Sequence, residues 1–334
     1  NIPCSRSLEV NGQLKMEGPE FEGLAGFTSK LGISDLAWAL WAADYCNEQG
    51  LDVITASECI AVSMECFERG IIDRSDTDGL ELTFGNTEAA GELLRQIAAV
   101  QGFGARFRDG ALAGALTLGP EAAALVMHVK GLEIFQADPR GMKGYALGVA
   151  VASRGGDHLR SEPWLEFSDD EEEARRRFGI PEIAHRLATR GKGLLVNYFE
   201  ERAAVSDALE ICKNTFNNME LPDYNLLAEL YQSLTGFEIT AADLERAGER
   251  IVNLERLYNL AHGLTPDQDT LPRRFTHEPL PAGASAGETV AIRELVREYY
   301  QARDWSLETG RPSHEKICEL GLAEEYELLS RRDG

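Results

Sequence analysis

Six cysteines carry the most specific chemistry in this chain, because iron–sulfur clusters are usually held by four thiolates. No two of them form a C-x-x-C pair, so spacing alone assigns none of them to a metal. Cys59 and Cys66 are seven residues apart on an expected helix face, which favours buried, inert thiols. We interpret Cys46 and Cys318 in the same way. The full set is Cys4, Cys46, Cys59, Cys66, Cys212 and Cys318.

Composition limits the classes of protein that the chain can belong to. With 334 residues it has room for about two domains and a substantial core. Its net charge of −23 argues against a nucleic-acid partner, which needs clustered basic residues. No apolar run approaches the length of a membrane span, and six cysteines do not make a disulfide framework. We therefore expect a cytoplasmic protein without a membrane or nucleic-acid partner.

Several short segments share their order and spacing with one enzyme family. They are residues 3–6, 18–22, 46–52, 138–141, 154–160 and 207–212. Together they resemble the tungsten-containing aldehyde ferredoxin oxidoreductases. The likeness continues through residues 249–259, 269–275, 298–305 and 320–322, so it covers essentially the whole chain. It implies the two C-terminal domains of that family, without the β-rich N-terminal domain on which the family's pterins sit.

The resemblance implies contacts to a tungsten ion held between two pterin dithiolenes. In the family, two Asp-x-x-Gly-Leu-(Asp/Cys) segments bind the pterins, and they correspond here to residues 47–52 and 207–212. In the first, Gly50 frees backbone groups at a helix end, although a plain helix that stops at glycine accounts for the same residues. In the second, Glu210 replaces glycine and resists a left-handed backbone, so we expect the helix to continue beyond it. The implied cofactor contacts are Asn47, Asp52, Asp207, Ile211 and Arg160.

The resemblance also assigns two of the cysteines to a [4Fe–4S] cluster. Cys4 matches the third cysteine of the family's C-x2-C-x3-C…C pattern, and Cys212 matches the fourth. Two thiolates cannot complete a cubane cluster. We therefore expect that the chain by itself holds neither an intact cluster nor, as a consequence, full activity.

Two further matches supply acid–base groups. Glu22 corresponds to a family glutamate near the metal, and His158 to a family histidine beside the substrate. Aldehyde oxidation takes an oxygen from water and removes protons, so the resemblance implies Glu22 as activator of water and His158 as the proton-transfer group. The other histidines lack ligand spacing. Lys130, Arg140 and Arg160 would together favour an anion, but pairing with the many acidic groups is an equal alternative.

Helical signals dominate the elements that must position these residues. The first 125 residues predict three helices. The first covers residues 34–49, with Ser34 as its N-cap and Gly50 at its end, and the other two end at Gly70 and Gly102. The helix that ends at Gly102 carries Val100 on its apolar face. Residues 125–135 predict an extended segment. Composition changes near the start of that segment, which suggests domains at 1–125 and 126–334.

The second part of the chain predicts a further series of helices. Ser168 begins one as its N-cap, followed by Glu/Arg pairs, and residues 183–216 are mostly helical with a break near 191–193. Thr240 begins a long helix with an apolar face of Leu244, Ala247, Ile251, Leu254 and Tyr258. Residues 290–305 form the last long helix. The fold class is therefore mainly α, with two packed helical domains and few short strands.

These observations favour the C-terminal region of an aldehyde:ferredoxin oxidoreductase. The parent enzyme would oxidise an aldehyde to a carboxylic acid at the tungsten–bis-pterin centre and pass electrons through the [4Fe–4S] cluster to ferredoxin. Molybdenum binds the same dithiolene donors. Two alternatives remain open: a family member that reduces an aromatic thioester or carboxylic acid, and a truncated, non-catalytic helical protein. A homo-oligomer is compatible with all of these.

Overall fold

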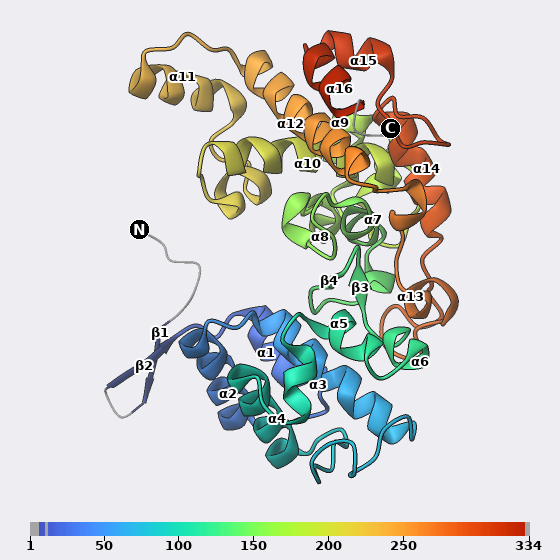
Figure 1. Cartoon of the computed structure of the whole chain (residues 1–334). Coiled ribbons are helices and arrows are strands. Elements are labelled where there is room, and N and C mark those ends of the chain that lie inside the picture. The colour runs from blue at the N-terminus through green and yellow to red at the C-terminus, as the bar shows by residue number, and fades with distance from the viewer. Residues whose placement is uncertain (1–6, 11–12, 331–334) are drawn as a thin grey trace. The chain divides into compact units, whose positions relative to one another are not determined.

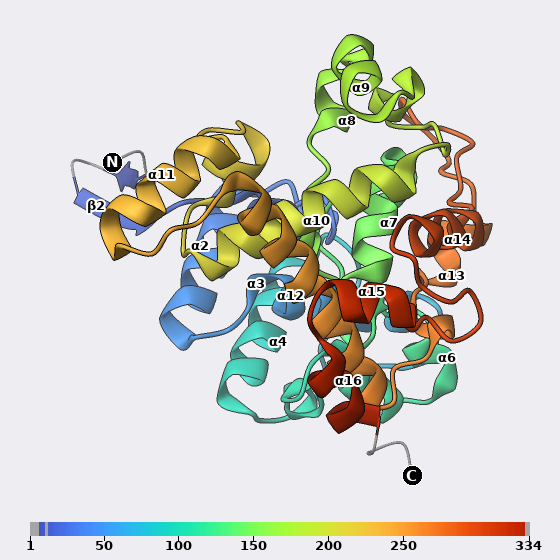
Figure 2. The same cartoon turned by 90° about the horizontal axis from the view of Figure 1, so that it is seen from above.

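The computed structural model describes residues 7–10 and 13–330, which are mainly α-helical, as the sequence predicts (Figures 1 and 2). Within this part of the chain, strands are confined to two short antiparallel pairs. The chain divides into two compact units, Asn1–Gln136 and Ala137–Gly334. Each unit is described by itself below.

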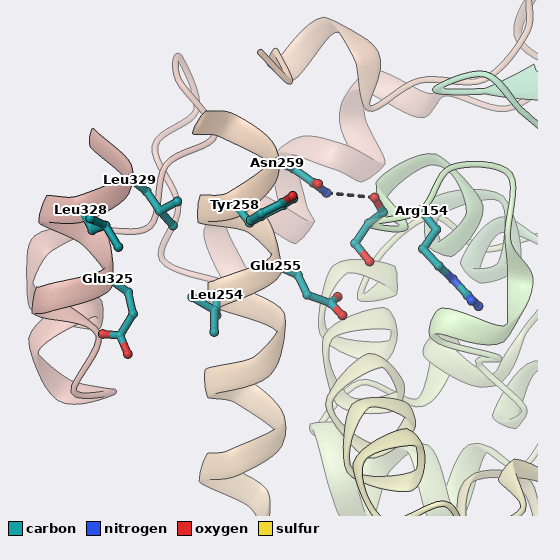
Figure 3. Close-up of a pocket in the computed structure, with 9 residues that line it drawn as sticks. Arg154, Leu254, Glu255, Tyr258, Asn259, Glu325, Leu328 and Leu329 are labelled. Carbon is teal, nitrogen blue, oxygen red and sulfur yellow. Dashed lines mark hydrogen bonds between the residues drawn. The ribbon is translucent and has the colours of Figure 1, made fainter. Parts of the chain in front are cut away.

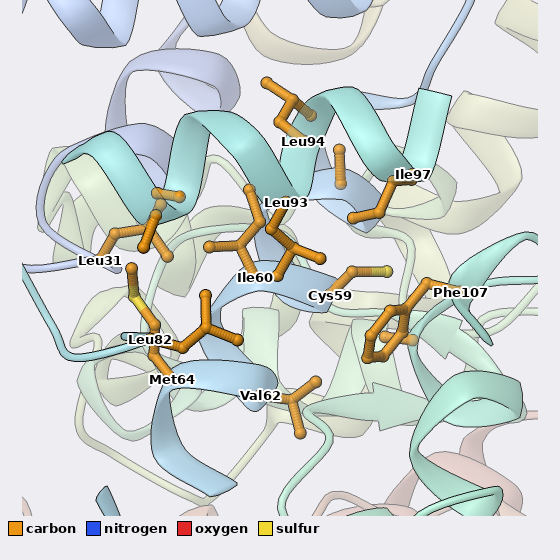
Figure 4. Packing of buried hydrophobic residues seen from close by; sticks show 14 of the residues in the cluster. Leu31, Cys59, Ile60, Val62, Met64, Leu82, Leu93, Leu94, Ile97 and Phe107 are labelled. Atoms are coloured by element: carbon orange, nitrogen blue, oxygen red, sulfur yellow. The ribbon is translucent and has the colours of Figure 1, made fainter. Parts of the chain in front are cut away.

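The helices of the first unit pack around one apolar core. Ile60 of α3 and Leu93 of α4 lie between their two helices in Figure 4, and both are fully buried. Its elements are β1 (Ser7–Val10), β2 (Gln13–Glu17), α1 (Phe21–Phe27), α2 (Leu36–Gln49), α3 (Val53–Glu68), α4 (Thr87–Ala99), η1 (Phe103–Phe107), α5 (Ala111–Leu116), α6 (Pro120–Ala123), β3 (His128–Val129) and β4 (Leu132–Glu133).

Helix ends in the first unit follow local side-chain chemistry. Asp35, one residue after the expected Ser34, is the N-cap of α2, and its carboxylate accepts a hydrogen bond from the Trp38 backbone N–H at 3.0 Å. Gly50 ends α2 in the left-handed conformation, as expected, with φ 69°. Val100 does not lie on the apolar face of α4, because it is the left-handed C-cap of that helix and is 51% exposed.

The expected extended segment at residues 125–135 is a tight hairpin formed by β3 and β4. Lys130 and Gly131 turn the chain with positive φ angles. Glu133 anchors the hairpin to the first unit, since its carboxylate accepts hydrogen bonds from Thr55 Oγ1 at 3.0 Å and from the Ala111 N–H at 2.8 Å. The compact units accordingly divide after Gln136, whereas composition placed a boundary at residue 125.

The second unit is organised around α10, which packs against α7, α12 and α14. Its elements are η2 (Pro139–Gly141), α7 (Lys143–Val151), η3 (His158–Arg160), α8 (Leu165–Ser168), α9 (Glu171–Phe178), η4 (Pro181–Ala184), α10 (Lys192–Ala208), η5 (Asn214–Asn218), α11 (Tyr224–Thr235), α12 (Ala241–Ala261), η6 (Pro266–Gln268), α13 (Arg273–His277), α14 (Ile292–Ala302), α15 (His314–Glu319) and α16 (Ala323–Ser330). Of these, η5 is a π-helical turn.

Several helix starts in the second unit differ from the expectation. Ser168 ends α8, and Asp170 rather than Ser168 caps α9 by accepting from the Glu173 N–H at 2.9 Å. The expected Glu/Arg pairs form on α9, where Glu173 binds both Arg176 and Arg177. The break expected near residues 191–193 is the start of α10, and the last long helix, α14, is shorter than residues 290–305.

The long helix α12 begins after Thr240, as expected, but of the five residues on its expected apolar face only Leu244 is buried. Tyr258, placed on the apolar face by its spacing, is 54% exposed. Two polar residues are buried instead: Asn253 accepts from Trp305 Nε1 at 2.8 Å, and Arg256 donates to Asp269 at 2.7 Å. The core side of α12 is therefore partly polar and fully hydrogen-bonded at these positions, which an apolar periodicity does not reveal.

Candidate functional site

The segment at residues 47–52 ends helix α2 with a Schellman motif. The Gly50 N–H donates to the Asn47 carbonyl at 3.3 Å, and the Leu51 N–H donates to the Cys46 carbonyl at 2.8 Å. Asn47 and Asp52 are both exposed. Asp52 is also the N-cap of α3, because its Oδ1 accepts from the Thr55 N–H at 2.7 Å. The segment thus connects two helices through one short, fixed turn that presents an amide and a carboxylate.

The segment at residues 207–212 ends helix α10 in the same way. The Glu210 N–H donates to the Asp207 carbonyl at 3.2 Å, and the Ile211 N–H donates to the Ser206 carbonyl at 3.0 Å. Glu210 takes the left-handed conformation, with φ 55°. The expectation that the helix continues beyond Glu210 is therefore wrong: α10 stops at Ala208, and the hydrogen-bond pair imposes the turn despite the side chain.

Replacing Glu210 by glycine is expected to stabilise the protein. A non-glycine residue in the left-handed region costs about 1–2 kcal/mol. Glycine removes this strain but also increases the conformational entropy of the unfolded chain, so the free energy of unfolding should rise by about 1 kcal/mol. Chemical denaturation measures the difference. The matched control is Ala208→Gly in the last turn of the same helix, which should lose about 0.5–1 kcal/mol. Equal losses in both variants would contradict the left-handed assignment.

Cys212 occupies the position in the second segment that Asp52 has in the first. Its carbonyl accepts from the Thr215 and Phe216 N–H groups, both at 3.1 Å, so it opens the turn that continues as η5. The Cys212 thiol is exposed. The last residue of each segment therefore stands at the start of the next helical element, with its side chain accessible.

The remaining cysteines differ in their surroundings. Burial raises the pKa of Cys46 to about 12, that of Cys66 to about 11, and that of Cys59 well above its usual value. These thiols stay protonated at neutral pH, as expected of inert core cysteines. Cys318 was expected to be buried but is exposed on the short helix α15, where its Sγ lies 3.8 Å from His314 Nδ1.

Metal-ligand candidates are sparse in the part of the chain that the structure describes. Cys4 lies outside the described residues. Among residues 7–10 and 13–330, no group of three or more His, Cys, Asp or Glu side chains is arranged to hold a metal ion. Of the two cysteines that the resemblance assigns to a cluster, Cys212 lies among the described residues, and its thiol is exposed.

Glu22 lies in the first turn of α1, near the first segment. Its Oε2 accepts a hydrogen bond from the Gln136 N–H at 2.7 Å. Burial raises the pKa of Glu22; the Gln136 hydrogen bond and Lys30 oppose this, and the Asp52 carboxylate adds a smaller increase. Glu22 and Asp52 are therefore close enough to interact electrostatically within the first unit. A raised pKa makes a carboxylate a stronger base than one in water, which suits a proton-accepting group.

His158 begins the 3₁₀ turn η3, which Asp157 caps by accepting from the Leu159 N–H at 2.8 Å. Burial lowers the pKa of His158; Asp157 opposes this effect, and Lys213 reinforces it. The imidazole is consequently neutral at pH 7 and keeps both an N–H donor and an acceptor nitrogen.

Ionic contacts join the His158 turn to the second segment. Arg160 Nη1 donates to Asp207 Oδ2 at 2.9 Å, and its Nη2 binds the Glu255 carboxylate. Lys213 Nζ lies 2.9 Å from Asp207 Oδ1 and donates to the Leu159 carbonyl at 2.7 Å. Folding thus brings the turn of His158 and Arg160 together with Asp207 and the start of η5, two regions that are about fifty residues apart in sequence.

Sequence reasoning missed Lys213 and Glu255 as members of this network. Lys213 adjoins Cys212, which is the one signal that could have identified it. Glu255 lies on α12 and gives no local signal. Arg140 pairs with Asp138 at 2.6 Å, so it and Arg160 each have their own acidic partners, as the alternative to a shared anion site proposed.

A hollow of about 500 Å³ lies beside this network, between α12, α16 and the loop at residues 153–154 (Figure 3). Asn259 Nδ2 donates to the Ser153 carbonyl at 2.8 Å and closes one side. Glu255 lines the hollow and also binds Arg160. Its remaining lining is largely apolar, with Leu254, Leu328 and Leu329.

Comparison with known proteins gives a consistent picture. Residues 1–322 match the family model described as aldehyde ferredoxin oxidoreductase, domains 2 and 3. The chain is 36% identical over 332 residues to a tungsten-containing aldehyde ferredoxin oxidoreductase of Pyrococcus furiosus, covering 97% of this chain and 52% of the relative. A protein of the same description from Thermococcus kodakarensis is 34% identical, with 97% and 51% covered. The chain thus spans about half the length of these relatives.

Two more distant proteins extend the comparison. An aliphatic sulfonate oxidoreductase, WOR-like subunit, of Pyrococcus furiosus is 28% identical, with 94% of this chain and 47% of that protein covered. The active site complex BamBC of benzoyl coenzyme A reductase superposes with a TM-score of 0.75 at 20% identity, covering 99% of this chain and 52% of that one. The second likeness concerns the fold alone. None of the helices among the described residues combines the length and apolarity needed to cross a bilayer.

Proposed function

Because the chain belongs to the aldehyde ferredoxin oxidoreductase family, we propose that it forms the C-terminal region of an enzyme that oxidises an aldehyde to a carboxylic acid. The centre would be a tungsten–bis-pterin group, and electrons would leave through a [4Fe–4S] cluster to ferredoxin. The observation that carries the proposal is the match of residues 1–322 to the family's domains 2 and 3, and the shared Schellman geometry of residues 47–52 and 207–212 is compatible with it.

The residues at the end of α10 fit a pterin ring, which both donates and accepts hydrogen bonds. The Asp207 side chain is 42% exposed, so its carboxylate is open to N–H donors even while it binds Arg160. Arg160 Nε is buried and has no hydrogen-bond partner among the described residues, so it offers a donor. In the first unit, Asn47 and Asp52 present an amide and a carboxylate to solvent.

The chain's own side chains would handle protons. When bound, the tungsten–pterin group supplies the two-electron redox chemistry and the cluster carries electrons away one at a time. Glu22 orients the attacking water and accepts a proton through Oε1, since Oε2 accepts the hydrogen bond from the Gln136 N–H. The neutral His158 imidazole donates a hydrogen bond to the aldehyde oxygen and takes part in proton transfer.

Metal content tests this proposal most directly. The protein is purified anaerobically from its native host and assayed for tungsten, molybdenum and aldehyde-dependent reduction of ferredoxin. We expect bound tungsten or molybdenum, and an Asp207→Asn variant that retains less of it because the ring loses a charged acceptor. Glu48→Ala, exposed in the first segment, serves as the control that leaves metal content unchanged. A stable, metal-free helical protein would instead support the non-catalytic alternative.

The isolated chain is expected to hold an incomplete cluster. After anaerobic reconstitution of the 334 residues with iron and sulfide, we expect clearly fewer than about four irons per chain, since a cubane needs about four thiolates. Iron and sulfide assays measure this. Cys212→Ser should lower the value further, whereas Cys318→Ser should leave it unchanged. A full complement of iron on the isolated chain would contradict the assignment of only Cys4 and Cys212 as ligands.

The substrate is the finer part of the proposal. The relatives named above include enzymes described as acting on an aldehyde and on an aliphatic sulfonate. The reduction of an aromatic thioester or a carboxylic acid stays as the second candidate. Turnover of the metal-loaded enzyme with an aldehyde, a sulfonate, an aromatic thioester and a carboxylic acid separates these classes.

A further inference from the structure

We propose that Lys213 and Asn217 are positioning residues that make the π-helical turn η5 a link between Cys212 and His158. This inference rests on the proposed function, in which Cys212 is a cluster ligand and His158 the proton-transfer group. It goes beyond that function because it assigns a role to two residues that act through their contacts with the His158 turn. The observations that carry it lie within the second unit.

The first observation is the backbone of η5. The Met219 N–H donates to the Asn214 carbonyl at 3.0 Å, a spacing of five residues. Single π-turns are rare and recur at functional sites, because the extra residue per turn re-aims the side chains that follow. Here the π-turn begins two residues after Cys212.

The second observation is that side chains in and next to η5 donate hydrogen bonds to the backbone of the His158 turn. Lys213 Nζ donates to the Leu159 carbonyl at 2.7 Å, and Asn217 Nδ2 donates to the Ser161 carbonyl at 2.8 Å. Asn218 Nδ2 adds a contact to Glu162 at 3.3 Å. Side chains of η5 and of its N-cap residue Lys213 thus hold the residues that follow His158.

The third observation is that η5 is itself fixed in the core, so that it can act as a rigid support. Phe216 is fully buried, and its ring lies 4.2 Å from the Arg202 guanidinium and 5.2 Å from the Tyr224 ring. Arg202 also donates to the Phe216 carbonyl. Asn217 is fully buried as well. A change at Cys212 therefore has a short, stiff connection to the His158 turn through Lys213.

The inference predicts that the His158 imidazole senses Lys213. In the intact 334-residue chain, labelled with ¹⁵N-histidine, the His158 resonances are followed against pH by NMR. Lys213→Met is expected to raise the His158 midpoint by about 0.5–1 pH unit, because a nearby cation is lost and the turn is released. Lys213→Arg should restore the wild-type midpoint. Lys316→Met, a pairing lysine on α15, is the control and should leave it unchanged.

The link to Cys212 has its own readout. In a background that carries both Cys4→Ser and Cys318→Ser, Cys212 is the exposed thiol among the described residues, and iodoacetamide is expected to modify it. Alkylation is expected to shift the His158 resonances in the parent chain and to have little effect in the Asn217→Ala and Lys213→Met variants. Asn217→Ser, which keeps a hydroxyl donor, covers the case in which Asn217→Ala does not fold.

The outcomes are distinct from those of the proposed function, since neither readout needs tungsten or turnover. A His158 midpoint that is the same in Lys213→Met and the parent chain would overturn the positioning role. So would His158 resonances that ignore alkylation of Cys212 in the parent chain. Either result would leave the proposed aldehyde oxidation unaffected, because that proposal is tested separately by the metal content of the protein.

Discussion

Replacing His158 by alanine is expected to lower the aldehyde turnover number of the tungsten-loaded enzyme by about 10²–10⁴-fold, the usual contribution of a positioned proton-transfer group. Burial and Lys213 lower the pKa of His158, so the wild-type imidazole is neutral at pH 7. If the neutral form is required, wild-type activity should fall as the pH drops through that lowered pKa. Steady-state kinetics across pH measure both effects.

The matched control is His262→Ala. His262 is exposed at the end of α12, where its ring stacks on Tyr258 with centroids 4.1 Å apart, and it has no contact with the Arg160–Asp207 network. Its loss should leave the turnover number unchanged. A His158→Ala enzyme with wild-type turnover and intact metal content would remove His158 from the reaction.

Replacing Lys192 by methionine is expected to destabilise the protein by about 3–5 kcal/mol, because it leaves the buried Glu166 carboxylate without its positively charged partner. Lys192 Nζ lies 2.5 Å from Glu166 Oε1, and both side chains are completely shielded from solvent. Burial raises the pKa of Glu166 and lowers that of Lys192, so each charge depends on the other. Glu166 also accepts from the Gly144 N–H at 2.9 Å, so the pair joins α7, α8 and α10.

The sign of the pH dependence distinguishes this mechanism from a packing defect. In Lys192→Met the folded pKa of Glu166 lies further above its unfolded value, so the folded state binds the extra proton. Stability should be fully present below the unfolded pKa and lost as the pH rises through the folded one. The double variant Glu166→Gln, Lys192→Met should recover most of the loss at neutral pH. Denaturant titrations measure each variant.

Lys316→Met provides the comparison on the surface. Lys316 Nζ binds Glu249 at 2.7 Å and Glu319 at 3.1 Å, but its side chain remains 17% exposed. Its loss should cost about 1 kcal/mol or less. Equal losses in Lys192→Met and Lys316→Met would show that Glu166 is not left with an uncompensated charge.

The sequence predicted much of the fold, because local rules govern helix ends. Gly50 ends its helix, and the Thr240 capping box begins another, as a single short segment dictates. Two helix starts were misplaced because two candidate caps lie close together: Asp35 caps α2 in place of Ser34, and Asp170 caps α9 in place of Ser168. A single sequence does not show which of two such side chains finds the better geometry for the free N–H groups.

Less of the candidate site could be predicted, because its contacts cross long stretches of chain. Cys212 was identified through its family position, and its exposure agrees with a ligand role that stays a prediction. The link from Arg160 to Glu255 spans 95 residues and had no local signal. Cys318 was assigned to the core, yet it is exposed, since neither its neighbours nor its spacing encode which face of α15 meets the protein.

The left-handed Glu210 bears on how relatives of this protein are recognised. The resemblance implies a glycine at this position, yet the turn after α10 forms with glutamate, since two main-chain hydrogen bonds hold it in place. The turn therefore depends on amide-to-carbonyl pairing, and a residue other than glycine can occupy it at a tolerable energetic penalty. Signatures written with an obligatory glycine would overlook such sequences, whereas signatures written in backbone shape would retain them.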